Sequence, residues 1–396
     1  MARSILGILN DEFGLAGAQL IDTHPQSPEN DRYSDPPKKS VVVGHYPVGE
    51  VRLDMGAIPF AEFNRDALYF VAHPYNDAVG VQPETVLKQM RLFGTNLLDH
   101  DADFKLLCAV LPIGPYDLNH SVKRQGRAGF LEGNGLKMHL DDLARAGFRE
   151  VIAIGSHSPT TKEIARNLGI NYREVDPFRA DAQVSSPTMG PLLYTSPENN
   201  TFVPNYEDQM KRLTPFITYL KEKIESLDDV YFVATDDGSV DVTEQITQAC
   251  RGNKQNMIGI IKGRDGPGKS KVYGVKSWST ANLEEIRGKT CVIADDRRLS
   301  GNTLNDVAAS LKEDYGVGRV VALCAHDMSY DEGIRNHTSV DEFVFLETNP
   351  NSPVAQIKDD PRIHRMSVDT TGLLLGAEVF DSYVTLRDNG AVGKVR

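Results

Sequence analysis

An acid pair followed by a small polar turn is the most chemically suggestive stretch of this sequence. Asp295 and Asp296 come directly after the apolar run 291–294, and the turn 300–303 reads Ser-Gly-Asn-Thr. Backbone N–H groups and hydroxyls of such a turn can hold a phosphate, while the carboxylates can reach ribose hydroxyls or a metal ion. An ordinary strand-to-helix connection capped by Ser or Thr fits the same spacing. The candidate sugar-phosphate residues are Asp295, Asp296, Ser300, Gly301, Asn302 and Thr303.

Two cations follow another apolar run. Lys262 and Arg264 come after the run 257–261 and lead into the Gly- and Lys-rich segment 265–271. Positioned cations stabilise the charge of a transferring phosphoryl group, and a loop that closes excludes water from an ATP-using site. A solvated basic turn explains the same residues without any function. The segment is not a P-loop, because the glycine spacing before Lys269 does not match that motif.

Two further strand ends carry polar candidates. His157 follows the apolar run 150–155, and the acid pair Asp236 and Asp237 follows the run 230–234. Ligands of open α/β sheets bind at the carboxyl ends of parallel strands, which favours a functional role for all three. A satisfied structural histidine and a helix cap are the competing interpretations.

The elements that must position these residues alternate between strands and helices. Alternation of this kind predicts mainly parallel sheets flanked by helices, and its recurrence in both halves predicts two similar α/β domains. We expect an N-terminal arm over 1–40, domains over 41–180 and 206–396, and a linker over 181–205. Strands are predicted from residue 40 and over 67–72, 104–112, 150–155, 230–234, 257–261, 291–294, 319–324 and 342–346, and helices over 83–98, 135–146, 206–227, 240–251 and from 304.

Composition limits the classes of partner. The chain has 396 residues and a net charge of -12, which argues against nucleic acid and anionic membranes as partners. The four cysteines are widely spaced without a C-x-x-C pair, so they indicate reduced core residues rather than a zinc or redox site. No apolar run reaches membrane-spanning length and the N-terminus does not resemble a signal peptide, so we expect a cytoplasmic protein.

Taken in order, several short segments resemble the phosphoribosyl pyrophosphate (PRPP) synthetase family. The stretch 295–303 resembles its ribose-5-phosphate loop, which is also found in phosphoribosyltransferases, and Lys262 and Arg264 match the Lys and Arg of its flexible catalytic loop. His157 falls at the histidine of its D-L-H motif. Weaker matches are Pro74-Tyr-Asn-Asp77, Leu111–Tyr116, Thr235-Asp-Asp-Gly238, Ala325-His-Asp-Met-Ser329 and Glu347-Thr-Asn-Pro350.

This resemblance implies two tandem phosphoribosyltransferase-like domains and a diphosphokinase. Such an enzyme transfers the β,γ-diphosphate of Mg-ATP to the C1 hydroxyl of a ribose 5-phosphate unit and releases AMP, so Mg²⁺ and ATP are the implied cofactor and co-substrate. His157 would contact Mg-ATP, with Arg124 and Arg127 near the nucleotide and Asp176 as a second metal contact. The family's site also implies a homo-oligomer, a dimer or a hexamer.

The departures from the family concern the acceptor and the nucleotide. Leu299 stands where the synthetases usually carry a third acid, and 116–121 lacks the family's Arg-Gln pair near ATP. One hypothesis is therefore a 5′-substituted ribose such as ADP-ribose as acceptor, giving a diphosphate for NAD synthesis. Two further hypotheses are a phosphoribosyltransferase that consumes PRPP and a non-catalytic homologue of a synthetase.

Overall fold

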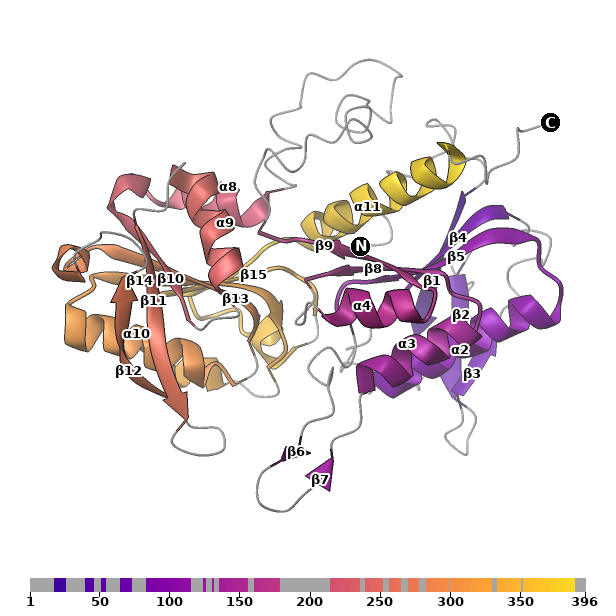
Figure 1. The fold of residues 1–396 in the computed structure, drawn as a ribbon, viewed down its shortest axis with the longest axis horizontal. Coiled ribbons are helices and arrows are strands. Elements are labelled where there is room, and N and C mark those ends of the chain that lie inside the picture. The colour runs from indigo at the N-terminus through magenta and orange to yellow at the C-terminus, as the bar shows by residue number, and fades with distance from the viewer. Residues whose placement is uncertain are drawn as a thin grey trace. The chain divides into compact units, whose positions relative to one another are not determined.

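The chain folds as two compact α/β units, each built on a seven-stranded sheet (Figure 1). One unit contains the described residues up to Val175 and those from Gly372 onward, and the other contains those from Asp176 to Thr371. The predicted fold class, two mainly parallel sheets flanked by helices, is confirmed. The computed structural model describes residues 18–25, 40–45, 51–54, 65–72, 83–114, 124–125, 130–131, 135–155, 160–178, 214–235, 239–251, 256–264, 270–277, 283–298, 300–329, 333–349 and 352–388.

The first sheet is parallel except at one edge. Its strand order is β3-β2-β1-β4-β5-β8-β9, and only the pair β2 and β3 is antiparallel. The two-stranded hairpin of β6 and β7 stands apart from it. The strands are β1 (Ala18–Pro25), β2 (Ser40–His45), β3 (Val51–Asp54), β4 (Arg65–Val71), β5 (Phe104–Leu111), β6 (Arg124–Gln125), β7 (Phe130–Leu131), β8 (Glu150–Ile154) and β9 (Asn171–Val175).

Helices cover both faces of this sheet. On one face, α2 (Pro83–Asp99), α3 (Gly135–Arg145) and α4 (Thr160–Asn167) share an apolar core with β4, β5 and β8, in which Phe70 and Phe93 lie 4.7 Å apart between ring centroids. On the other face lies α11 (Val368–Asp388), where Ser382 contacts the Tyr69 hydroxyl at 3.1 Å (Figure 1). Apolar residues at helical spacing in the helices and continuous apolar runs in the strands produce this three-layer packing.

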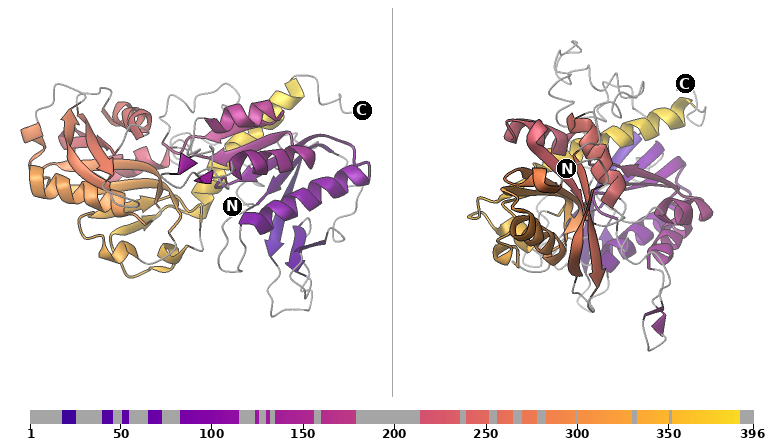
Figure 2. Two further views of the ribbon diagram at one scale, coloured as in Figure 1. Left: turned by 60° about the horizontal axis from the view of Figure 1, so that its bottom comes forward. Right: turned by 60° about the vertical axis from the view of Figure 1, so that its left-hand side comes forward.

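The second sheet repeats the pattern of the first. Its order is β12-β11-β10-β13-β14-β15-β16, again with one antiparallel pair, β11 and β12, at the same edge position. The edge hairpin can be followed in the right-hand view of Figure 2. The strands are β10 (Val230–Ala234), β11 (Met257–Arg264), β12 (Ser270–Ser277), β13 (Thr290–Arg298), β14 (Arg319–Asp327), β15 (Glu342–Phe345) and β16 (Ile363–Arg365).

Two layers of helices cover the second sheet as well. Helix α10 (Asn302–Tyr315) buries Leu304, Val307, Ala308 and Leu311 against one face. Helices α8 (Pro215–Lys223) and α9 (Val240–Arg251) lie on the opposite face (Figure 1). Short 3-10 turns, η5 (Leu227–Asp229), η7 (Leu283–Ile286), η8 (Gly333–Asn336) and η9 (Pro353–Gln356), connect the remaining strands. The matching strand orders show that the expected duplication holds at the level of topology.

Three expectations need correction. Residues 18–25 are not part of an arm outside the first domain, because β1 pairs with β2 and β4 inside the sheet. The segment 270–277, for which no strand was predicted, is the edge strand β12, which pairs with β11. The C-terminal boundary also differs, because the chain from Gly372 clusters with the first unit through α11.

Cys108, Cys291 and Cys324 are buried and Cys250 is half-buried, all four as free thiols. Helix α8 is shorter than the predicted 206–227 and starts at a proline, which suits the first helical turn. Within the described residues, no helix combines the length and apolar character needed to span a membrane.

Candidate functional site

The described sequence candidates of the second unit lie on or just after strands that neighbour β10. In the order β11-β10-β13, β11 ends at Arg264, β10 at Ala234 and β13 at Arg298. Parallel strands place their carboxyl ends at one edge of the sheet. The chain also reverses its direction of winding between β10 and β13, and ligands of open α/β sheets bind at such switch points.

The acid pair lies within β13 rather than after it. The predicted strand stops at residue 294, but the observed strand pairs with β14 through Asp295 and Cys324 and continues to the pair of Arg298 and Asp327. Both acids are half-buried, and Asp296 Oδ2 lies 3.6 Å from Arg297 Nε. The strand is longer than its apolar run because β14, which carries polar residues at its own end, supplies pairing partners for the whole segment.

The polar turn opens directly into α10. Gly301 is the residue before the helix, with a left-handed φ of 76°, and no side chain caps the helix there. The Asn302 N–H contacts Ser300 Oγ at 3.4 Å, and the Asn305 N–H donates to the Gly301 carbonyl at 3.0 Å. A helix start without a side-chain cap presents backbone N–H groups and the positive end of the helix dipole to an anion. The residue at the cap position is therefore a glycine, and the hydroxyl contact to the helix start comes from Ser300, one residue earlier.

Space beneath the turn is filled by two buried side chains. A Cβ atom on residue 301 would lie 2.6 Å from Arg298 Nε and 2.7 Å from His337 Cε1, so only glycine fits. The Arg298 side chain has no exposed surface, and its Nη2 donates to the Ser300 carbonyl at 3.2 Å. Its Nη2 also lies 3.4 Å from His337 Nδ1. The turn is therefore supported from inside the protein by an arginine and a histidine.

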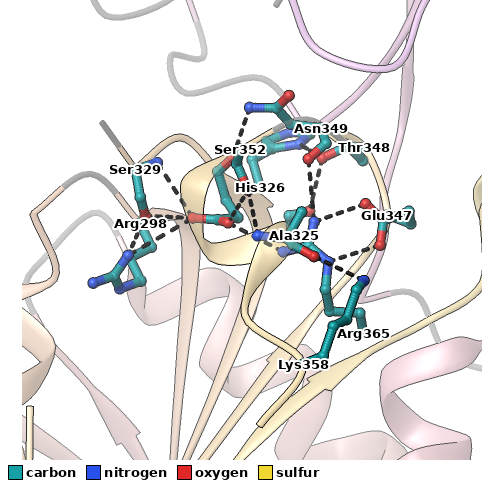
Figure 3. A network of polar contacts seen from close by, with 12 residues as sticks. Arg298, Ala325, His326, Ser329, Glu347, Thr348, Asn349, Ser352, Lys358 and Arg365 are labelled. Carbon is teal, nitrogen blue, oxygen red and sulfur yellow. Dashed lines mark hydrogen bonds and ion pairs between the residues drawn. The ribbon is translucent and has the colours of Figure 1, made fainter. Parts of the chain in front are cut away.

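Asp327 balances the charge of Arg298 inside the protein. Its Oδ1 lies 3.7 Å from Arg298 Nη1 and also accepts from Ser329. Its Oδ2 accepts from Ser352 Oγ at 2.5 Å and from Arg365 Nη1 at 3.1 Å. Arg298, Ser329, Ser352 and Arg365 are labelled among the polar side chains of this network in Figure 3.

Arg365 joins this cluster to the end of β15. Its Nε and Nη2 donate to the two carboxylate oxygens of Glu347, at 2.7 and 2.8 Å, which is the bidentate geometry of a strong ion pair (Figure 3). Burial lowers the pKa of Arg365, but the bonded Glu347 and nearby Asp327 raise that pKa by more, so the guanidinium stays charged. The fully buried His326 adds a contact of 3.1 Å from Nδ1 to Thr348 Oγ1.

The expected loop cations lie on a paired strand. Lys262 and Arg264 belong to β11, and their backbones pair with Val272 and Ser270 of β12 after a register shift at Ile261. The expectation of a loop at these two residues is therefore wrong, because both residues pair with the edge strand β12. Their position at the end of β11, one strand from β10, keeps them at the same edge of the sheet as the acid pair.

The structure describes two other predicted site residues, Asp176 and Arg124. Asp176 Oδ1 accepts the Phe178 N–H at 2.8 Å, and Phe178 stacks on Phe216. Arg124 lies in the hairpin strand β6. Within the described part of the chain, no group of three or more His, Cys, Asp or Glu residues forms a metal site. The candidates His157, Asp236, Asp237 and Arg127, and the departure at Leu299, lie outside the described residues.

Sequence reasoning missed the buried charges that support the turn. Arg298, Asp327, Glu347 and Arg365 come from four segments and are brought together only by the pairing of β13 to β16. One signal was visible in the sequence, since β13 and β14 both end on charged residues directly after fully apolar runs. A charge in such a position is stable only with a partner from a neighbouring strand.

Comparison with known proteins identifies what this arrangement is similar to. No protein-family model matches the chain. It is 35% identical over 88 residues to a ribose-phosphate pyrophosphokinase of Marinomonas sp. (strain MWYL1), covering 22% of this chain and 27% of that protein. It is 33% identical over 115 residues to a ribose-phosphate pyrophosphokinase of Nitrosomonas europaea, covering 28% of this chain and 32% of that protein. The matches thus span about a third or less of these relatives.

The fold comparison extends over much more of the chain. The crystal structure of phosphoribosylpyrophosphate synthetase from Mycobacterium smegmatis superposes with a TM-score of 0.61, covering 94% of this chain and 100% of that chain at 16% identity. At this identity the likeness concerns the fold. The local sequence matches are thus to ribose-phosphate pyrophosphokinases, and the extended fold match is to a phosphoribosylpyrophosphate synthetase.

Proposed function

We propose, from the premise that this chain is a divergent PRPP synthetase-like protein, that it is a diphosphokinase acting on a ribose 5-phosphate unit. The observation that carries the proposal is the turn 300–303, a helix start at Gly301 that carries Ser300 and Thr303 and follows the half-buried acids of β13 in the chain. Backbone donors of this kind suit the 5-phosphate, and the carboxylates suit the ribose hydroxyls. Asp236 and Asp237, which follow the neighbouring strand β10, complete the proposed sugar site.

In the proposed reaction, the C1 oxygen of the sugar attacks the β-phosphorus of ATP. The bond between the β-phosphorus and the α,β-bridging oxygen breaks, AMP leaves, and the C1 hydroxyl proton is released to solvent. Lys262 and Arg264 stabilise the charge on the transferred group. Catalysis rests on positioning and electrostatics, with no covalent enzyme intermediate.

The proposal also includes residues that would bind Mg²⁺ and the nucleotide. Mg²⁺ usually binds enzymes through one or two carboxylates and keeps substrate phosphates and water as its other ligands, so the oxygen donors Asp295 and Asp296 suit it. The ion would neutralise charge on the triphosphate. His157 and Asp176 are proposed contacts of Mg-ATP, and Arg124 and Arg127 are proposed to lie near the nucleotide.

AMP release from ATP in the presence of ribose 5-phosphate tests the activity. Loss of one cation that stabilises the transition state lowers kcat by roughly 10²–10³-fold, which we expect for Lys262→Ala. Lys276→Ala is the matched control, because Lys276 lies on the same hairpin but pairs with Gly259, well before the strand end. Equal activity of both variants, or diphosphate release from PRPP plus a base without AMP formation, would refute the diphosphokinase proposal.

The identity of the acceptor is a separate question. Leu299, in place of the family's third acid next to the ribose-phosphate turn, favours an acceptor whose contacts there differ, such as ADP-ribose. Initial rates with ribose 5-phosphate and ADP-ribose at equal concentrations distinguish the two. Turnover with ribose 5-phosphate and none with ADP-ribose excludes the substituted acceptor and removes the link to NAD synthesis. We also expect a homo-oligomer, which light scattering of the full chain would reveal.

A further inference from the structure

A short chain of hydrogen bonds connects the buried Arg298 to the start of α10. Arg298 Nη2 lies 3.4 Å from His337 Nδ1, and His337 Nε2 lies 3.3 Å from Asn302 Oδ1. Arg298 has no exposed surface and His337 is 6% exposed, whereas Asn302 is exposed at the first position of the helix. The two ring nitrogens of one histidine therefore link a buried cation to a surface amide.

The chemistry of arginine determines the direction of every bond in this chain. A guanidinium carries only donors, so His337 Nδ1 must be the acceptor and must lack a proton. In a neutral imidazole the proton then resides on Nε2, which donates to Asn302. Only the amide oxygen of Asn302 can accept this bond. The amide nitrogen Nδ2 consequently points away from His337.

This orientation has a consequence for the anion site. Asn302 follows Gly301, and its backbone N–H belongs to the same helix start that faces the proposed phosphate. With Oδ1 held by His337, Nδ2 adds a side-chain donor to the backbone donors of the turn. The opposite orientation would present a carbonyl oxygen, which repels a phosphate. A single proton position inside the protein thus decides whether the turn offers a donor or an acceptor.

We propose that Arg298 and His337 are positioning residues that orient the Asn302 amide, so that its Nδ2 donates to the phosphate of the sugar substrate. The proposal rests on the proposed function insofar as the turn 300–303 is the sugar-phosphate site. It assigns no chemical step to either residue. Both act through Asn302, and neither touches the substrate.

Two arginines contact His337, one at its ring and one at its backbone carbonyl. Arg298 faces the ring from the end of β13, and Arg362, from the turn before β16, donates to the His337 carbonyl at 2.7 Å. Arg362 also pairs with Asp360 at 2.7 Å, and Arg298 pairs with Asp327 at 3.7 Å. From α10 the ring meets the neutral Asn302, and from β15 it meets an aromatic ring. A proton on Nδ1 would oppose the Arg298 donor and break the chain.

The tautomer is directly measurable. In protein labelled with ¹⁵N-histidine at pH 7.5, the signal that disappears in His337→Gln should show a bare Nδ1 and a protonated Nε2. In Arg298→Met this tautomer preference should be lost. A His337 ring that is charged, or protonated on Nδ1, in the wild-type protein would overturn the proposal whatever the enzyme's activity.

Ribose 5-phosphate binding, measured by calorimetry without ATP, tests whether the hydrogen bonds from Arg298 through His337 to Asn302 support phosphate binding. His337→Phe and Asn302→Asp should each weaken ribose 5-phosphate binding roughly tenfold or more, as expected for losing a hydrogen bond to a charged group. His337→Gln, whose amide carries an acceptor and a donor, should retain most of the affinity. Thermal melting of each variant separates a loss of folding from a loss of orientation.

A pH series supplies a readout that a merely structural role would not move. The ratio of ribose 5-phosphate affinities, wild type over His337→Gln, cancels the titration of the sugar phosphate itself. This ratio should fall as the pH decreases from 7.5 to 5.5, because only the histidine can take up a proton. A ratio that stays constant over this range would overturn the proposal.

The outcomes separate this inference from the proposed function. Wild-type protein that binds ribose 5-phosphate but releases no AMP with either ribose 5-phosphate or ADP-ribose overturns the diphosphokinase alone. Folded His337→Phe and Asn302→Asp variants with wild-type ribose 5-phosphate affinity overturn the positioning role alone. Wild-type protein that binds neither ribose 5-phosphate nor ADP-ribose overturns both.

Discussion

Replacing Gly301 by alanine tests whether the turn depends on the buried side chains beneath it. Gly301 has a φ of 76°, and Gly288, in the same unit, has a φ of 72° with nothing within 4 Å of an added Cβ. Alanine at either position bears the left-handed backbone cost of about 1–2 kcal/mol. Gly288→Ala is therefore a matched control for the backbone effect.

The difference between the two variants measures the contact beneath the turn. At residue 301 the new Cβ would lie 2.6 Å from Arg298 Nε and 2.7 Å from His337 Cε1. Arg298 cannot swing away without breaking its contacts to Ser300 and Asp327, and His337 cannot do so without breaking its contacts to Arg298 and Asn302. Such overpacking typically costs a further ~1–3 kcal/mol. We expect Gly301→Ala to lower the free energy of unfolding by about 2–5 kcal/mol in total, from the two terms together.

Urea unfolding of both variants, followed by ribose 5-phosphate binding of the folded proteins, provides the assay. If the turn yields instead of the side chains, the loss of stability will be smaller but ribose 5-phosphate affinity will fall in Gly301→Ala and not in Gly288→Ala. Equal unfolding free energies combined with equal ribose 5-phosphate affinities in the two variants would refute the reasoning. That result would mean that Arg298 and His337 do not constrain the turn.

Three predictions concern the first unit. Burial lowers the pKa of His139 from 6.5 to about 3. Between these two values only the unfolded chain takes up a proton, so the free energy of unfolding should fall as the pH falls from 6.5 to 3, by up to roughly 5 kcal/mol. His139→Leu should flatten this dependence in urea titrations at several pH values. Gly94→Ala places a Cβ 2.0 Å from the Ala146 carbonyl oxygen and should destabilise the first unit by about 3 kcal/mol in thermal melting. An unchanged melting temperature would contradict this close approach. Glu150→Gln removes the charge that Arg173 contacts at 3.1 Å and should cost about 1–3 kcal/mol in urea unfolding; no loss would show that the buried pair is neutral to stability.

Local patterns of the sequence were sufficient for the α/β rhythm and for the turn. Continuous apolar runs predicted the strands around Phe232 and Val292, and the spacing Leu304, Val307, Ala308 and Leu311 predicted the buried face of α10. These features depend on neighbours within a few residues, which hydrophobic periodicity reports directly. The strand β1 was missed because Ala18–Pro25 mixes polar and apolar residues and its pairing partners lie elsewhere in the chain.

Some features of the candidate site could be predicted from the sequence, and others could not. The sequence by itself determined the order of strand, acid pair, glycine turn and helix, because each follows the last along the chain and obeys local rules. Only the tertiary structure decided that Lys262 lies on a paired strand and that Arg298 meets Asp327 and His337 beneath Gly301. Those contacts join segments 29 and 39 residues apart, and a buried charge finds its partner through strand pairing and burial, which no local pattern encodes.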